Sequence, residues 1–187
     1  RLGLLLPFVT MSAQTVWDGS VATSFAGGTG TQDDPYLISD GAELAYLAKI
    51  TNDDPNVTDG KYYKLIHDIV LNDDVLNENF ELNGTPANLW SPIANVDYRQ
   101  TGFMGDFDGN GHSIMGMYVF YNVSGHHQKG LFGALSGSAV VHDLAVVDSY
   151  MNTMYCTGLI SGVLNDRSVV RRCYASGKID ASGEPYI

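Results

Sequence analysis

An acidic run in the middle of the chain has the residue types of a calcium loop. Asp106, Asp108 and Asn110 alternate and Gly111 follows, as in the first half of an EF-hand loop, where alternating oxygens wrap the ion. The second half is missing, because Met117 stands where a bidentate Glu is needed. Asp-Gly-Asn-Gly also suits a tight turn between strands. We therefore expect a turn here and assign no metal ligands.

The five histidines raise the question of a metal centre or a general base. His126 and His127 are adjacent, and His112 and His142 belong to nearby segments. Adjacent residues of a strand point to opposite faces, so this pair cannot readily share an ion. The sequence around His126 is typical of an exposed loop. We predict a solvated pair and no metal site.

Arg171 and Arg172 are the basic residues with which a polysaccharide-cleaving site could be built, since such sites combine carboxylates with a nearby base. Asp143 precedes Arg172 by one period of the repeat described below. Charges on neighbouring strands ordinarily pair. We expect a surface salt bridge between Asp143 and Arg172, and we assign no catalytic residue and no cofactor.

Outward aromatic residues are the candidates for ligand binding. Tyr118 and Tyr174 fall between the expected inward positions of the repeat, and Trp90 and Trp17 lie elsewhere in the chain. Sugar rings pack their apolar faces on aromatic rings, so these aromatics form a hypothetical platform for a glycan, to which we assign Tyr118, Tyr174 and Trp90.

Composition places the chain among turn-rich β proteins. The 187 residues include 21 glycines and 11 tyrosines, with 44% hydrophobic and 17% charged residues, which suits one all-β domain with a buried core. The net charge of -11 repels phosphate backbones and anionic lipids, so we expect no nucleic acid partner.

The first residues have the pattern of an export signal. Arg1 precedes an apolar run from Leu2 to Val9, and small residues follow at Ser12 and Ala13. We interpret residues 1–14 as the C-terminal part of a signal peptide, with a buried first strand as the alternative. The run is shorter than the about 20 residues that span a bilayer, so we expect no membrane insertion of the mature chain.

Residues 15–100 form an N-terminal lead-in and cap region. The proline turn at Asp34-Pro35 predicts a strand at Tyr36–Ile38. Asp40 and Glu43 have capping-box spacing and open a helix over about 40–51, whose apolar face carries Leu44, Leu47 and Ala48. A strand is predicted over 62–71, and residues 72–88 are predicted to form a loop.

Three segments within 101–187 repeat one pattern, in coils of about 27–29 residues. We align three columns that should stack inward: Ile114/Val141/Val170, Met117/Leu144/Cys173 and Val119/Val146/Ala175. Stacked columns predict a right-handed parallel β-helix, an all-β solenoid capped by the short helix, over a hairpin sandwich. The chain stops where a further coil should begin, so we expect truncation at the C-terminus. The separation between Cys156 and Cys173 does not match the repeat, so we expect two unpaired thiols.

Two short motifs carry a family resemblance. Gly130-Leu131-Phe132-Gly133 and Gly158-Leu159-Ile160-Ser161-Gly162 resemble the GLUG motif of large bacterial surface proteins, and residues 103–114 look like the coil that precedes it in pectate-lyase-like β-helix proteins. Arg171-Arg172 departs from the pattern, which usually has a small polar residue or Asn there. The resemblance implies a secreted or cell-surface setting and transfers no catalytic residue.

Two functions are consistent with these features. The first is a non-catalytic, adhesin-like repeat module that binds a glycan or an extracellular protein, or that acts as a spacer. The second is part of a β-helix polysaccharide lyase or glycoside hydrolase whose active site lies outside this fragment, which rests on fold analogy.

Overall fold

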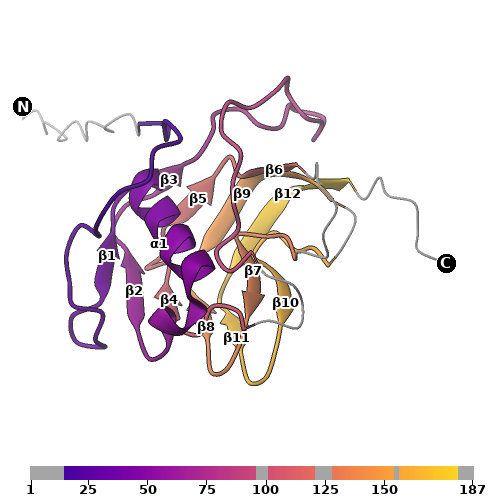
Figure 1. Cartoon of the computed structure of the whole chain (residues 1–187). Coiled ribbons are helices and arrows are strands. Elements are labelled where there is room, and N and C mark those ends of the chain that lie inside the picture. Colours follow the sequence, from indigo (N-terminus) through magenta and orange to yellow (C-terminus); the bar gives the residue numbers. More distant parts are fainter. Residues whose placement is uncertain (1–14, 96–100, 121–127, 154–155, 181–187) are drawn as a thin grey trace, which may run out of the picture.

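The described residues fold mainly into short strands with one α-helix, which confirms the all-β prediction at the level of class. The computed structural model describes residues 15–95, 101–120, 128–153 and 156–180. The helical elements are α1 (Gly41–Asp53) and the 3-10 helix η1 (Pro55–Thr58), and they precede most of the strands (Figure 1).

Within the described ranges, the strands form three sheets in which every strand pair is parallel. Parallel neighbours need crossover connections, so a sandwich of hairpins is excluded for the described strands. The first sheet has the order β1 (Tyr36–Ile38), β2 (Tyr62–Leu65), β4 (Asp106–Asp108), β8 (Val140–His142), β11 (Val169–Arg171). The second pairs β7 (Phe132–Leu135) with β10 (Ser161–Leu164). The third has the order β12 (Tyr174–Asp180), β9 (Ala145–Asn152), β5 (Ser113–Met115), β3 (Ile69–Val70), and β6 (Tyr118–Phe120) also pairs with β9.

Strand register confirms the predicted step between the last two layers of strands. Val141 pairs with Val170 and Val146 with Ala175. The amide of Tyr174 donates to the carbonyl of Leu144 at 2.9 Å, which brings Cys173 beside Leu144 at the same step.

The step predicted from Ile114 to Val141 is wrong. Val141 pairs with Phe107 in place of Ile114, and Ile114 pairs with Val146. Val119 pairs with Met151, and the carbonyl of Met117 accepts from Tyr150, so neither residue lies beside the predicted partner. The alignment equated β5 with β8, but β5 belongs to the third sheet and β8 to the first. The turn 109–112 after β4 is also longer than the turn 143–144 after β8, which accounts for part of the greater length of the earlier layer. Motif spacing cannot reveal the lengths of such connections.

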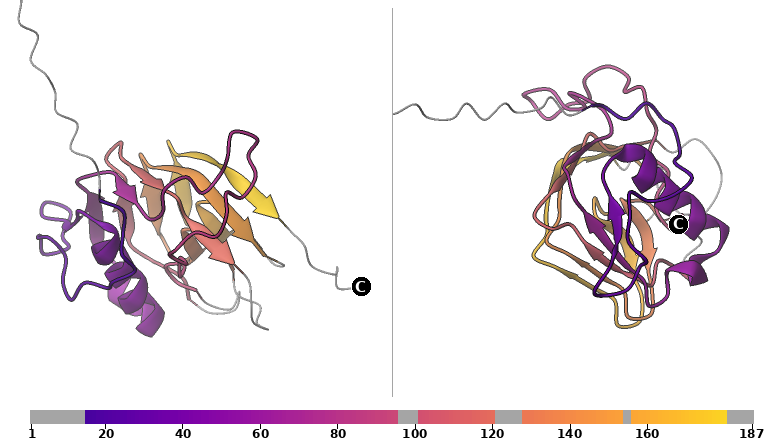
Figure 2. Two further views of the ribbon diagram at one scale, coloured as in Figure 1. Left: turned by 90° about the horizontal axis from the view of Figure 1, so that it is seen from above. Right: turned by 90° about the vertical axis from the view of Figure 1, so that its left-hand side faces the viewer.

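The interior is apolar and closed to solvent along most of the stack. Phe107, Ile114, Val141 and Val146 are 0% exposed. Burial decreases at the last layer, where Val170 is only partly buried against the same core. The sequence colours advance from β1 at one end to β12 at the other, which shows that the layers follow chain order (Figure 2).

Two corners of the chain repeat their backbone conformation from one layer to the next. Gly137 and Asp166 have φ of 63° and 55°, and Asp143 and Arg172 have φ of 53° and 51°. Both pairs are separated by the same step along the chain. Non-glycine residues adopt this left-handed conformation rarely, so its recurrence indicates that the two layers turn in the same way.

Helix α1 begins and ends close to the predicted bounds of 40–51. Asp40 accepts from the Glu43 amide at 2.9 Å, as the capping box predicts. The Glu43 carboxylate reaches back one residue further than expected, to the amide and hydroxyl of Ser39 at 2.6 and 2.8 Å. The predicted apolar face is buried, with Leu44 and Leu47 at 0% exposure and Ala48 at 3%. This helix lies at the β1 end of the stack (Figure 2).

The strand predicted over 62–71 is two strands, β2 and β3, separated by a corner. The segment 72–88 that follows is a loop, as predicted, and its two ends are joined by an amide clamp. Asn72 donates to the carbonyl of Asn88 at 2.9 Å, and the Asn88 amide donates to the side chain of Asn72 at 2.8 Å. The clamp fixes where the chain leaves the loop and enters residues 89–91.

Both cysteines are free thiols, as expected: Cys156 is exposed and Cys173 is partly buried. Among the described residues, no helix has the length and apolar character needed to cross a membrane.

Candidate binding groove

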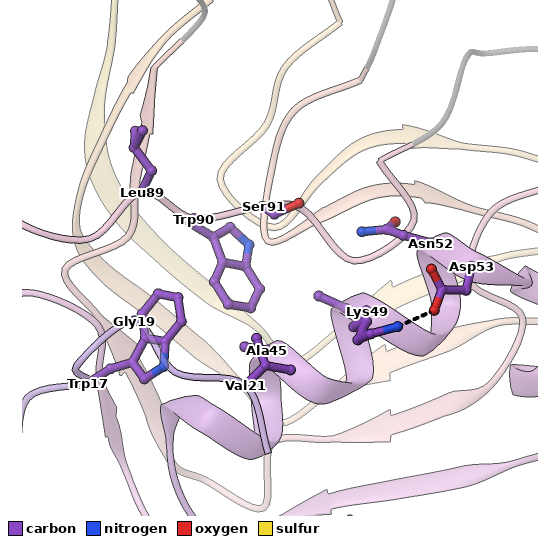
Figure 3. A pocket seen from close by; sticks show the side chains of 11 residues that line it. Trp17, Gly19, Val21, Ala45, Lys49, Asn52, Asp53, Leu89, Trp90 and Ser91 are labelled. Atoms are coloured by element: carbon purple, nitrogen blue, oxygen red, sulfur yellow. Dashed lines mark hydrogen bonds and ion pairs between the residues drawn. The ribbon is translucent and has the colours of Figure 1, made fainter. Parts of the chain in front are cut away.

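A groove with a volume of about 320 Å³ lies between α1, the segment before β1 and the segment after the 72–88 loop. Its walls are mostly apolar. The lining residues are Trp17, Gly19, Val21, Ala45, Ala48, Lys49, Asn52, Asp53, Leu89, Trp90 and Ser91 (Figure 3). The chain has two tryptophans, and both line this groove.

Trp17 forms one wall and is held at its backbone and at its ring. Its amide donates to the carbonyl of Val70 at 2.8 Å, next to the Val16–Val70 bridge. Its indole N–H donates to the Ser20 carbonyl at 2.7 Å. The ring packs so closely on Gly41 that a Cβ there would lie 2.5 Å from Cγ of Trp17. Glycine at the first residue of α1 is therefore what lets this indole lie against the helix.

Trp90 forms the floor. Its indole N–H donates to the carbonyl of Leu131 at 3.2 Å, and its amide donates to the carbonyl of Tyr118 at 2.8 Å. The two indole rings meet edge to face, with centroids 6.0 Å apart. Asn88 links the two sides of the groove, because its side chain donates to the carbonyls of Trp17 and Leu71.

The C-terminal part of α1 supplies the polar rim. Lys49 and Asp53 form an exposed ion pair one helical turn apart, and the Asp53 carboxylate raises the pKa of Lys49 (Figure 3). Asn52 donates to the carbonyl of Pro92 at 3.1 Å and accepts from the amide of Asn95 at 2.7 Å. These two bonds attach the end of the helix to the chain that follows Trp90.

Exposed apolar side chains at the mouth leave part of the groove uncovered. Leu89 is 54% exposed and Val21 is 48% exposed. A ligand with one apolar face and a rim of hydroxyl groups would cover these side chains while its hydroxyls meet Lys49 and Asp53. The arrangement is suited to binding, because the walls are apolar and charged groups stand at the rim.

The three aromatic residues predicted to bind a ligand do not form one platform. Trp90 is 4% exposed and lies in the groove. Tyr118 is 7% exposed and is covered by Val75 of the 72–88 loop, so its predicted exposure is wrong. Tyr174 is 62% exposed on β12, as predicted. Trp17 and Trp90 are both among the candidate aromatics of the sequence, but no spacing indicates that their indoles meet, because they are far apart along the chain.

The expected turn and salt bridge are confirmed. Asn110 adopts φ of 53°, and its amide donates to Asp108 at 2.7 Å within a tight turn. Arg172 contacts both carboxylate oxygens of Asp143 at 2.5 Å. The Arg172 guanidinium, with His142, holds the pKa of Asp143 below its usual range.

Two of the described histidines, His112 and His142, lie beside carboxylates. His112 lies 3.3 Å from Asp68, and His142 lies beside carboxylates of the first sheet. His126 and His127 fall outside the described residues.

Sequence comparison finds similarity to two much longer proteins. A protein named halomucin, from Haloquadratum walsbyi (strain DSM 16790 / HBSQ001), is 27% identical over 148 residues, which are 79% of this chain and 2% of that protein. A putative Gly-rich membrane protein from Evansella cellulosilytica is 29% identical over 139 residues, 74% of this chain and 14% of that protein. The chain thus spans a small part of either relative. No family model matches it, and no solved structure matches it.

Proposed function

We propose that this chain is a non-catalytic binding module of an exported cell-surface protein, and that it binds a glycan in the groove between α1 and Trp90. The observation that carries the proposal is that both tryptophans line one apolar groove with a polar rim. Sugar rings present such a mixed surface, and a volume of about 320 Å³ is at the small end for ligand pockets, which suits one ring.

The module is proposed to be a segment of a right-handed parallel β-helix. Two observations support this architecture: all strand pairs are parallel, and two neighbouring layers keep one step along the chain in two sheets. The repeated left-handed corners at Gly137/Asp166 and Asp143/Arg172 support it further. In this proposal α1 caps the β1 end, and β10, β11 and β12 are the edge on which a further coil stacks.

The surface setting rests on sequence features. The apolar run from Leu2 to Val9 has the pattern of a signal peptide, and the GLUG-like motifs resemble those of bacterial surface proteins. One relative is named a membrane protein, which agrees with a location at the cell envelope.

Tryptophan fluorescence tests the groove directly, because both tryptophans of the chain line it. Purified protein from Thr15 onward is titrated with neutral methyl glycosides and short oligosaccharides, from micromolar to tens of millimolar. We expect a saturable change in emission with one class of sugar, and equilibrium dialysis gives the stoichiometry.

A matched pair of variants separates the groove from the rest of the surface. Leu89→Ser removes an aliphatic wall of the groove, whereas Leu164→Ser makes the same change on β10 at similar exposure, 54% against 51%. We expect Leu89→Ser to weaken binding about tenfold, from the loss of roughly 1 to 2 kcal/mol of apolar contact, and Leu164→Ser to bind as the parent does. Binding that is equal in both variants, or absent for all sugars, refutes the groove proposal.

The architecture is tested separately. A second copy of residues 153–180 is added in frame after Asp180, so that a new layer can pair with β10, β11 and β12. We expect backbone amides of these strands to exchange more slowly and the protein to unfold at higher denaturant concentration. No added protection in any of the three strands contradicts the stacked-coil proposal.

A further inference from the structure

His142 lies in a charged ladder on the outer face of the first sheet. Register places Lys64, Asp108, His142 and Arg171 side by side on β2, β4, β8 and β11. The His142 side chain is 13% exposed, so the imidazole is largely enclosed by its neighbours.

The two ring nitrogens of His142 have different surroundings. Nε2 lies 3.0 Å from a single carboxylate oxygen, Oδ1 of Asp106. Nδ1 lies 2.7 Å from Oδ2 of Asp143 and 3.6 Å from Oδ1 of Asp108. One ligand atom each from Asp108, His142 and Asp143 lie within 4.8 Å of one another.

These separations suit the coordination sphere of a small divalent transition-metal ion. Bonds of about 2.0–2.1 Å in tetrahedral geometry place ligand atoms about 3.3 Å apart, and the two distances from Nδ1, 2.7 and 3.6 Å, lie on either side of that value. With its proton on Nε2 and donated to Asp106, the imidazole would be oriented as metal-binding imidazoles are, and the lone pair of Nδ1 would face Asp143 and Asp108.

The surrounding cations leave a place for such an ion. Lys64 contacts Oδ2 of Asp108 at 3.4 Å, whereas the oxygen nearer to Nδ1 is Oδ1. The amide of Asn110 donates to Oδ1 of Asp108 at 2.7 Å. Arg172 contacts both oxygens of Asp143. An ion bound at Oδ2 would replace the hydrogen bond from Nη2 of Arg172, and the hydrogen bond from Nε to Oδ1 would remain.

We propose that Nδ1 of His142, Oδ1 of Asp108 and Oδ2 of Asp143 bind a zinc-type divalent ion, with Asp106 as the residue that orients the imidazole. The site joins β4, β8 and the turn after β8, and it therefore ties neighbouring layers together. It is independent of the groove and of the glycan.

The test uses Zn²⁺ for affinity and Co²⁺ for ligand identity. His126 and His127 are further imidazoles to which zinc can bind outside the proposed site. The titrations are therefore run on the full chain carrying His126→Ala and His127→Ala. Calorimetry should give one Zn²⁺ per chain. Co²⁺ should show the visible bands of a four- or five-coordinate N/O site without thiolate charge-transfer absorption, which separates this site from Cys156 and Cys173.

His142→Ala should raise the dissociation constant at least 100-fold, and Asp106→Asn should raise it 10- to 100-fold through the lost orienting bond. The matched control is His112→Ala, because His112 faces the single carboxylate Asp68. This control should bind as the parent does. His142→Gln, which keeps a hydrogen-bonding side chain, serves if His142→Ala does not fold.

Each of three results would overturn the proposal. The first is zinc binding that survives His142→Ala or His142→Gln. The others are a cobalt spectrum with thiolate bands and the absence of binding up to millimolar zinc.

Discussion

Val141 and Val170 occupy equivalent positions in adjacent layers, so one substitution can measure how burial changes along the stack. They pair in register, yet Val141 is 0% exposed and Val170 is only partly buried. Val→Ala removes the equivalent of two methylene groups, which costs about 1.6 kcal/mol at ~0.8 per group. Val141 is enclosed on both sides, by Phe107 and Val170, so the cavity adds ~1 kcal/mol.

Val141→Ala should therefore destabilise the chain by about 2 to 3 kcal/mol. Val170→Ala should cost at most about 1 kcal/mol, because no strand of the described residues pairs with β11 on its outer side and the space left behind stays open to water. Urea unfolding monitored by circular dichroism measures both, and the slope against urea should not change.

Equal costs at the two positions would refute the reasoning, since they would mean that the β11 edge is as enclosed as β8. The chain extended by a second copy of 153–180 is the control. There Val170 gains an outer neighbour, and Val170→Ala should become as costly as Val141→Ala.

Three further predictions concern local contacts. Burial opposes ionisation of Asp68, but hydrogen bonds from the Ser113 amide and from His112 outweigh it and lower the pKa of Asp68 from 3.8. The ionised Asp68 therefore stabilises the fold above pH 3.8, and this contribution is lost as the pH falls below that value. The difference in urea midpoint between parent and Asp68→Asn should shrink as the pH falls from about 5 to about 3. A difference that grows on acidification contradicts this. Asp40→Ala should lower the free energy of unfolding in urea by about 1 kcal/mol, because the helix cap is lost. The control Asp53→Ala, at an exposed ion pair, should lower it by no more than about 0.5 kcal/mol. Equal losses would argue against the cap. Phe80 is exposed and has φ of 58°, so Phe80→Gly should stabilise by about 0.5 to 1 kcal/mol, and a lower thermal midpoint would count against strain at this residue.

Local chemistry explains what could be predicted from the sequence. The Asp40–Glu43 cap, the turn at Asp108–Gly111 and the strand after Pro35 depend on neighbouring residues, and all three form as expected. The Asp143–Arg172 bridge was predictable as well, because no insertion changes the step between the layers that carry it.

The tertiary structure decided which distant segments meet. Phe107 took the place assigned to Ile114 because Ile114 lies on β5 of the third sheet, whereas Val141 pairs in the first sheet, and residue spacing does not show to which sheet a strand belongs. Tyr118 is covered because the 72–88 loop folds over it. Trp17 reaches Trp90 because Gly41 admits an indole, and His142 reaches Asp106 because parallel register places their strands side by side. Sequence by itself therefore determined the local elements and the last repeat, whereas both candidate sites arise from contacts between residues far apart along the chain, which only the folded structure brings together.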